Sequence, residues 1–363
     1  MSEISIDAIQ ETSVVRAGET LDWSRLAAYI RAHFAKSGEP LSHDQMSVEQ
    51  FPGGHSNLTY LLRFGEREYV MRRPPLGTLP PRAHDMAREY RLLARVHPVF
   101  HLAPRPILLC EDASIIGATF YLMERRRGLI IRAHEPAQVR ERAEVRRAIS
   151  SKIVDALAAL HAVNIRAHKL EDLGKPAGFV ARQVKGWTER WRKAQTEEVA
   201  EMEHVARWLD KNMPLDATVP TLVHGDFKLD NVMLDARDIT RVVGVFDWEM
   251  AAIGDPLVDL GILLSYWTHA AAAIPDAASL AGVTHLPGWF TRDEIVERYG
   301  AQSGRDVSNI KFYEVFAVFK LAVVAGQIFY RFRHGQTADP RFAHFDEYVR
   351  ALAKRAFETM NAE

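Results

Sequence analysis

The sequence contains very little cysteine and no long uninterrupted apolar run. Cys110 is the one cysteine among 363 residues, so a disulfide within the chain is impossible and a zinc site built on cysteines is not expected. The first thirteen residues are polar and acidic and contain no apolar core of the signal-peptide kind. The apolar stretch 315–330 is interrupted by Lys320, Gly326 and Gln327, so we expect a buried helix there and no membrane partner. A cytoplasmic protein is the resulting expectation.

The chain also carries almost no net charge. Lys and Arg number 46 and Asp and Glu number 47, which gives a formal net charge of −1. No basic field is available to attract nucleic acid, so a nucleic-acid partner is not expected. The hydrophobic share of 47% and the charged share of 26% are typical of a soluble globular protein, and the length is sufficient for two lobes.

The stretch 222–260 is the most informative part of the sequence. It contains three polar side chains, Asp226, Asn231 and Asp247, each beside a short apolar run. The runs predict three short strands of one small sheet, at residues 221–223, 232–234 and 242–246. Residues 235–238 are typical of a turn, and a hairpin closed by that turn would bring Asn231 and Asp247 together.

An acid, an amide and a second acid in this order suit phosphoryl transfer from ATP. Mg²⁺ prefers oxygen ligands, and one carboxylate plus one amide leave room for water and phosphate oxygens. A further aspartate can orient a hydroxyl acceptor and take its proton as the bond to phosphorus forms. A lone aspartate beside a strand is more often a turn or cap residue, so the argument rests on the ordered set.

The set consists of three motifs that follow one another, His224-Gly225-Asp226 with Asn231, then Phe246-Asp247-Trp248-Glu249, then Gly254-Asp255-Pro256. The first two match the H-R-D-x-x-x-x-N and D-F-G pattern of protein kinases. The set most resembles the aminoglycoside phosphotransferase/choline kinase family, and within it the branch found fused to, or near, acyl-CoA dehydrogenases. The resemblance extends from about residue 51 to beyond residue 267 and is weakest after residue 287.

This resemblance implies an α+β fold of the two-lobed, protein-kinase-like kind. The implied small lobe, residues 1–124, has an antiparallel sheet plus helices and binds the nucleotide. The implied large lobe, residues 125–363, is mostly helical and carries catalysis and acceptor binding. ATP and Mg²⁺ are the implied cofactors. By this resemblance, Asp226 would take the proton of the acceptor hydroxyl, and Lys228 would neutralise the transferring phosphoryl group. Asn231 and Asp247 would hold Mg²⁺, with Glu249 as an additional metal partner. Asp259 would brace the catalytic loop through hydrogen bonds.

The expected nucleotide site lies in the small lobe. A turn of glycines and small polar residues is expected to approach the phosphates, and it contains Gly53, Gly54, Ser56 and Asn57. An ordinary hairpin turn is the simpler alternative for these residues. Protein kinases carry a lysine on the following strand, where this sequence has Arg72, and arginine binds phosphate through a planar fork. Glu89, on a helix expected at 82–96, matches the glutamate that pairs with that cation. Met123 and Glu124 belong to the expected hinge, whose backbone would bind the adenine edge.

Apolar periodicity predicts the remaining elements. Helices are expected near residues 26–34, 145–161, 180–191, 202–209, 257–267, 291–300, 308–332 and 340–358, with a loop at 272–290. Asp22 is the candidate N-terminal cap of the first of these helices. His161 is interpreted as a helix-end residue and not as a catalytic one. Trp187 and Trp191 either pack in the core or line an acceptor pocket. Strand alternation points Arg73 to the face opposite that of Arg72.

Two hypotheses compete for the function. The first is an ATP-dependent phosphotransferase acting on a hydroxyl of a small molecule, for which the acyl-CoA-associated branch suggests a hydroxyacyl-CoA-type metabolite. The second is a catalytically weak, kinase-like nucleotide-binding module, which Arg72 favours and the intact set Asp226, Asn231 and Asp247 disfavours. A polycationic aminoglycoside is less favoured, because it needs a carboxylate-rich pocket. Acyl-CoA dehydrogenase activity is not expected, because no separate dehydrogenase-sized region remains beside the kinase-like part.

Overall fold

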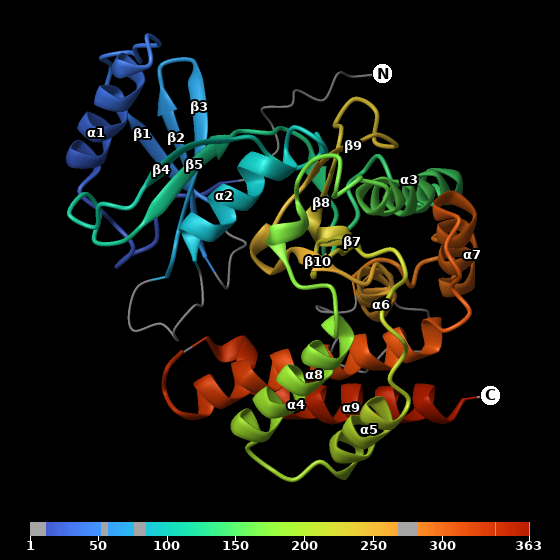
Figure 1. Cartoon of the computed structure of the whole chain (residues 1–363). Coiled ribbons are helices and arrows are strands. Elements are labelled where there is room, and N and C mark those ends of the chain that lie inside the picture. Colours follow the sequence, from blue (N-terminus) through green and yellow to red (C-terminus); the bar gives the residue numbers. More distant parts are fainter. Residues whose placement is uncertain (1–11, 52–56, 76–84, 268–281, 338, 363) are drawn as a thin grey trace. The chain divides into compact units, whose positions relative to one another are not determined.

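The computed structural model describes residues 12–51, 57–75, 85–267, 282–337 and 339–362 (Figure 1). The chain divides into two compact units. The first contains residues 1–128 together with 243–249, and the second contains residues 129–242 together with 250–363. The seven-residue segment 243–249 therefore belongs to the first unit although it lies far along the chain, and it carries Asp247 with it.

The first unit contains a five-stranded antiparallel sheet. Its strands lie in the order β1-β2-β3-β5-β4, and their bounds are Ser47–Gln50, Leu58–Phe64, Arg67–Arg73, Pro106–Cys110 and Phe120–Glu124 for β1 to β5. In this register Arg72 lies opposite Thr59 on one side and Tyr121 on the other. The central position of β3 therefore places Arg72 within the sheet and away from its edges.

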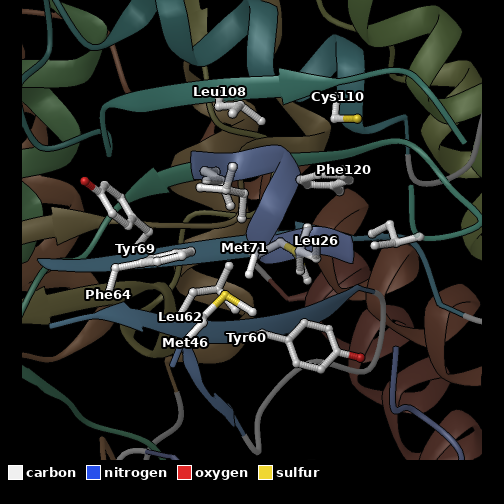
Figure 2. Close-up of a cluster of buried hydrophobic side chains, with 14 of the residues drawn as sticks. Leu26, Met46, Tyr60, Leu62, Phe64, Tyr69, Met71, Leu108, Cys110 and Phe120 are labelled. Atoms are coloured by element: carbon white, nitrogen blue, oxygen red, sulfur yellow. The ribbon is translucent and has the colours of Figure 1, made fainter. Parts of the chain in front are cut away.

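Two helices complete the first unit. Helix α1, Trp23–Lys36, begins at Asp22, whose side chain accepts from the Arg25 N–H at 2.9 Å, as the sequence predicted. Helix α2, Met86–Val96, begins in the same way after Asp85. Figure 2 shows the apolar cluster that joins α1 to the sheet, with Leu26 of α1 and Met71 of β3 among its members. Because neighbouring residues of a strand face opposite sides, Arg72 points away from this cluster.

The second unit is mostly helical. Its helices are α3 Ala143–His161, α4 Phe179–Ala194, α5 Ala200–Lys211, α6 Leu257–Tyr266, α7 Arg292–Ser303, α8 Ile310–Arg333 and α9 Phe345–Asn361. Helix α8 is central, since it packs against α4, α5, α6 and α9 (Figure 1). It is long and apolar enough to cross a membrane by length and composition, but 78% of its most apolar window is buried within the protein, as expected of a core helix.

The remaining strands are short, and their bounds are β6 Leu129–Ile130, β7 Thr221–Val223, β8 Val232–Leu234, β9 Val242–Val245 and β10 Ala252–Gly254. Strand β7 leads into the loop that carries Asp226, and β8 leads out of it. The prediction that β7 shares one sheet with β8 was wrong. Strand β7 pairs with β10 in a separate two-stranded sheet, while β8 pairs with β6. The loop is therefore supported at its start by the segment that follows Glu249.

Candidate active site

Asp226 lies in the loop between β7 and β8, in the second unit. The side-chain Nδ2 of Asn231 donates to the backbone oxygen of Asp226 at 2.9 Å and to its Oδ2 at 3.2 Å. The ammonium of Lys228 lies 3.0 Å from the same Oδ2, and both side chains of this ion pair are partly exposed. The structure thus brings two of the predicted site residues, Lys228 and Asn231, to the carboxylate of a third, Asp226.

The carboxylate of Asp259, on helix α6, accepts hydrogen bonds from the backbone of this loop. Its Oδ2 accepts from the backbone N–H of His224 at 2.6 Å, and its Oδ1 accepts from the N–H of Gly225 at 2.7 Å. Burial opposes the charge of Asp259, but the hydrogen bond and charge of His161, together with the contribution of His224, lower its pKa below the ordinary value. The predicted bracing role of Asp259 is confirmed.

His161 at the end of α3 completes the support. Its Nε2 lies 3.2 Å from Asp259 Oδ2, and its Nδ1 lies 2.7 Å from the Tyr299 hydroxyl of α7. The side chain is fully buried, so it acts on Asp259 and is not exposed to a substrate. This agrees with the interpretation of His161 as a residue at a helix end without a chemical step of its own.

Gly225 is required by the backbone of the loop. Its φ of +80° lies in the left-handed region, and a Cβ at this position would lie 2.7 Å from the backbone oxygen of Met250. Both conditions exclude a side chain, because the Met250 backbone cannot yield as a flexible side chain would. The middle residue of the His-Gly-Asp motif is therefore a packing requirement of this loop.

Lys228 has a second neighbour that sequence reasoning missed. Its ammonium lies 4.7 Å from the ring centroid of Tyr266, the last residue of α6. Burial opposes the charge of Lys228, but the nearby Tyr266, Asp226 and Asp230 more than offset it and hold its pKa well above the usual range. Lys228 is therefore a permanent cation beside Asp226. Tyr266 gave no signal in the sequence because it lies at the end of an apolar helix, where an aromatic residue is ordinary core.

Arg72 is the centre of the site in the first unit. Its Nη2 lies 3.2 Å from Asp247 Oδ1 and 3.5 Å from Glu89 Oε1. The pairing with Glu89 that was inferred from the resemblance is therefore present. Burial opposes the charge of Arg72, but Glu89, Tyr121 and Asp247 more than offset it and raise its pKa. Burial in turn raises the pKa of Glu89. Arg73 points to the opposite face as predicted, and burial lowers its pKa.

The segment with Asp247 is fixed to the first unit by its neighbours. The Val245 N–H donates to the Leu102 oxygen at 2.8 Å, and the Trp248 indole donates to the Val245 oxygen at 2.8 Å. Asp247 itself has a φ of +70°, an uncommon conformation for a residue with a side chain. Such strain persists only where the surrounding structure imposes it, and it turns the Asp247 carboxylate toward Arg72.

Glu249 adds a third carboxylate near Arg72. Its Oε2 accepts from Asn57 Nδ2 at 2.9 Å, and its backbone oxygen accepts from Arg88 Nη1 at 2.7 Å. Burial and the negative charge of Asp247 raise the pKa of Glu249 to about 7. Asn57 thus lies beside the acidic group, whereas Gly53, Gly54 and Ser56 of the predicted phosphate turn lie outside the described residues. That turn's role stays a prediction.

Met123 and Glu124 lie at the end of β5, opposite Val70 and Tyr69 of β3. The Glu124 N–H donates to the Arg105 oxygen at 2.9 Å, and its Oε1 accepts from the Arg105 N–H at 3.0 Å. These contacts order the start of the expected hinge. Binding of an adenine edge by this backbone stays a prediction.

The residues predicted to hold Mg²⁺ fit that role chemically, each in its own unit. Asn231 uses its amide nitrogen toward Asp226, which turns its amide oxygen to the other side, where a hard cation can take it. Asp247 shares its surroundings with the carboxyl groups of Glu89 and Glu249, and Arg72 and Arg88 are cations beside them. The carboxylate oxygens of Asp247 are of the kind that Mg²⁺ prefers as ligands. Because the two residues belong to different units, their joint action stays a prediction.

A family model described as the phosphotransferase enzyme family matches residues 47–295. The chain belongs to this phosphotransferase family. Acyl-CoA dehydrogenase family member 11 of Mus musculus is 33% identical over 336 residues, which are 92% of this chain and 42% of that protein. Family member 10 of the same species is 32% identical over 320 residues, 88% of this chain and 30% of that protein. The chain thus spans less than half the length of these relatives.

Solved structures of phosphotransferases confirm the fold. A candidate aminoglycoside phosphotransferase from Ralstonia eutropha has a TM-score of 0.74 at 29% identity and covers 94% of this chain and 98% of that one. Macrolide 2'-phosphotransferase type I has a TM-score of 0.59 at 19% identity, covering 93% and 98%. A thermostable mutant of the phosphotransferase APH(4)-Ia, solved with ADP and hygromycin B, has a TM-score of 0.57 at 14% identity, covering 92% and 99%. The predicted kinase-like α+β fold is therefore correct for this chain.

Proposed function

We propose that the protein transfers the γ-phosphoryl group of ATP to a hydroxyl group of a small molecule. The observation that carries the proposal is the arrangement at Asp226, a partly exposed carboxylate on a loop held by hydrogen bonds with Asp259 and Asn231, with the cation Lys228 3.0 Å away. Membership of the phosphotransferase family supports the same reaction type. Nucleotide use is supported by the family's solved complex with ADP.

In this proposal Asp226 accepts the proton of the acceptor hydroxyl and orients its oxygen toward phosphorus. Lys228 offsets negative charge that develops on the transferring group, since its pKa is held well above the usual range. Arg72, held by Glu89, binds phosphate oxygens of ATP as a planar fork. Asn231 and Asp247 would hold Mg²⁺, which when bound supplies positive charge at the phosphate oxygens.

The acceptor class that we favour is a hydroxyacyl-CoA-type metabolite. Its support is the identity with acyl-CoA dehydrogenase family members over nearly the whole of this chain. A reaction that phosphorylates an acyl-CoA hydroxyl would sit beside acyl-CoA chemistry in those longer relatives. The dehydrogenase activity in their names is not proposed for this chain, and purified protein with stoichiometric bound flavin would contradict that view.

The deciding experiment is a screen for acceptor-dependent ADP formation with Mg²⁺, using the Asp226→Ala protein as the blank. The panel pairs hydroxyacyl-CoA thioesters with the corresponding free hydroxy acids, and it includes choline, homoserine and an aminoglycoside. We expect turnover with at least one hydroxyl compound and greater turnover with the thioester than with the free acid. Turnover only with the free acids or the aminoglycoside would reject the favoured acceptor class and keep the reaction type.

A nucleotide-binding module with weak catalysis is the second candidate, because Arg72 stands where kinases carry lysine. It predicts a thermal shift with ATP and no turnover across the panel. The enzyme predicts slow Mg²⁺-dependent ATP hydrolysis that Asp247→Asn abolishes. Wild-type hydrolysis that survives Asp247→Asn would count against the assigned metal role.

A further inference from the structure

Lys320 is a buried cation in the middle of the apolar helix α8. Its residue is only 8% exposed, and its neighbours Phe319 and Ala322 are completely buried. Isolated ammonium groups are expensive to bury, so one in such a position requires partners that offset the loss of water. In the part of the chain that the structure describes, its one hydrogen bond runs from Nζ to the backbone oxygen of Gly225, at 2.6 Å.

The ammonium faces charged groups from several elements. Asp226 and Asp259 attract it, whereas Lys228 and Arg190 repel it, and burial lowers its pKa overall. The indole ring of Trp187 on α4 lies 5.4 Å from Nζ and offers its negative face. Burial alone would favour an apolar residue at position 320. The presence of a lysine there is therefore explained by the contact that its ammonium makes with the Gly225 oxygen.

The contact is made to the peptide group that immediately precedes the Asp226 side chain. The oxygen of this peptide accepts from Lys320, and its N–H, which belongs to Asp226, donates to His224 Nδ1 at 3.2 Å. One residue earlier, Asp259 accepts the N–H groups of His224 and Gly225. An anion thus holds the N–H side of the loop, and a cation holds its carbonyl side.

We propose that Lys320 is a positioning residue for Asp226, which fixes the Gly225–Asp226 peptide plane through a charge-assisted hydrogen bond and thereby sets the direction of the Asp226 carboxylate. The inference rests on the proposed function, in which Asp226 accepts the acceptor proton. Rotation of this peptide would swing the carboxylate away from its productive position, and small misplacements of a reacting group reduce rate more than binding. Lys320 touches neither reacting atom.

The test compares Lys320→Met, which keeps the length of the side chain and removes the donor, with Lys320→Arg, which keeps charge and donors. Lys311→Met is the control, because Lys311 lies on the same helix, is only partly buried and donates to the backbone oxygen of Ala362 instead of the Asp226 loop. With any accepted hydroxyl compound, we expect Lys320→Met to lower kcat about 10- to 100-fold, the usual loss for one hydrogen bond to a charged group. The KM for ATP should stay within about twofold, and Lys320→Arg should recover part of kcat.

Hydrogen exchange of the loop gives a readout that needs no acceptor. The amides of His224, Gly225 and Asp226 should exchange faster in Lys320→Met than in the wild type and in Lys311→Met. If Lys320→Met does not fold, Lys320→Gln, which keeps a neutral donor, takes its place with the same direction expected in kcat and exchange. Wild-type kcat or wild-type exchange in the folded variant overturns the proposal. A wild type without turnover rejects the proposed function instead, and the exchange comparison still decides the role of Lys320.

Discussion

Replacing Asp259 by Asn tests whether charge holds the catalytic loop. The amide has the shape of the carboxylate but offers one acceptor oxygen and one NH₂ group, so one of the two backbone N–H groups would face a donor. The backbone nitrogens of His224 and Gly225 lie 2.6 and 2.7 Å from the two carboxylate oxygens of Asp259, whose side chain is fully buried. The substitution therefore leaves one buried donor unpaired and removes the charge that strengthens the other bond.

The expected loss of unfolding free energy is about 3–5 kcal/mol at pH 7. An unpaired buried donor contributes about 1–3 kcal/mol, and the weakened bonds to the remaining N–H and to His161 contribute about 1 kcal/mol each. Urea unfolding followed by hydrogen exchange in the second unit measures this loss, with Asp210→Asn, exposed on α5, as a control expected to change stability by less than about 0.5 kcal/mol.

The pH dependence of this loss has a definite sign. The pKa of Asp259 is lowered in the folded protein, so its stabilising contribution is complete above the ordinary value of about 4 and disappears as the pH falls through the lower folded-state pKa. The contribution of the Asp259 charge to the difference between wild type and Asp259→Asn should be at its full value at pH 7 and should shrink below about pH 4. A difference under about 1 kcal/mol at pH 7, or one that grows on acidification, would refute the reasoning.

Three further substitutions test single features of the site. Asp226→Ala should lower kcat by at least about 10²–10⁴-fold with little change in the KM for ATP, and near-normal turnover would remove the assigned base. Gly225→Ala should destabilise the second unit by about 1–3 kcal/mol because its Cβ would lie 2.7 Å from the Met250 oxygen, whereas Gly304→Ala, also at positive φ but in open space, should cost about 1 kcal/mol in urea titrations. Arg72→Met should destabilise the first unit by about 3–5 kcal/mol and weaken ATP binding at least about tenfold in a titration, and unchanged affinity would contradict its phosphate role.

The main elements could be predicted from the sequence because their signals are local. Helix α8 was predicted at 308–332 and spans Ile310–Arg333, and the Asp22 cap of α1 was predicted with its role. The pairing of β7 was not predictable in the same way. Its partner β10 is the three-residue run Ala252–Gly254, which is too short and too poor in β-branched residues to give a strand signal.

The site was predictable where its residues lie close together in the sequence. Asp226, Lys228 and Asn231 lie within six positions of the sequence, and in the structure Lys228 and Asn231 both contact the Asp226 carboxylate. The contacts of Arg72 with Glu89 and of Asp259 with the loop were inferred from the family pattern, since the residues alone allowed a solvated helix charge and an N-terminal helix acid. Apolar patterning predicted a strand at residues 242–246 but could not assign the segment 243–249 to a unit.

Lys320 shows why part of the site could not be predicted, and the same packing explains how the site is built. In the sequence it interrupts an apolar run, and its partner Gly225 lies 95 positions away. Helices α6 and α8 approach closely because residue 261 is glycine, where a Cβ would lie 2.4 Å from the Tyr313 oxygen. Each of these apolar helices carries one buried charge toward the loop, Asp259 from α6 and Lys320 from α8. The backbone N–H and carbonyl groups of the loop stabilise two charges that would otherwise be costly to bury in apolar helices. The same hydrogen bonds therefore fix the backbone of the Asp226 loop and offset the burial of Asp259 and Lys320.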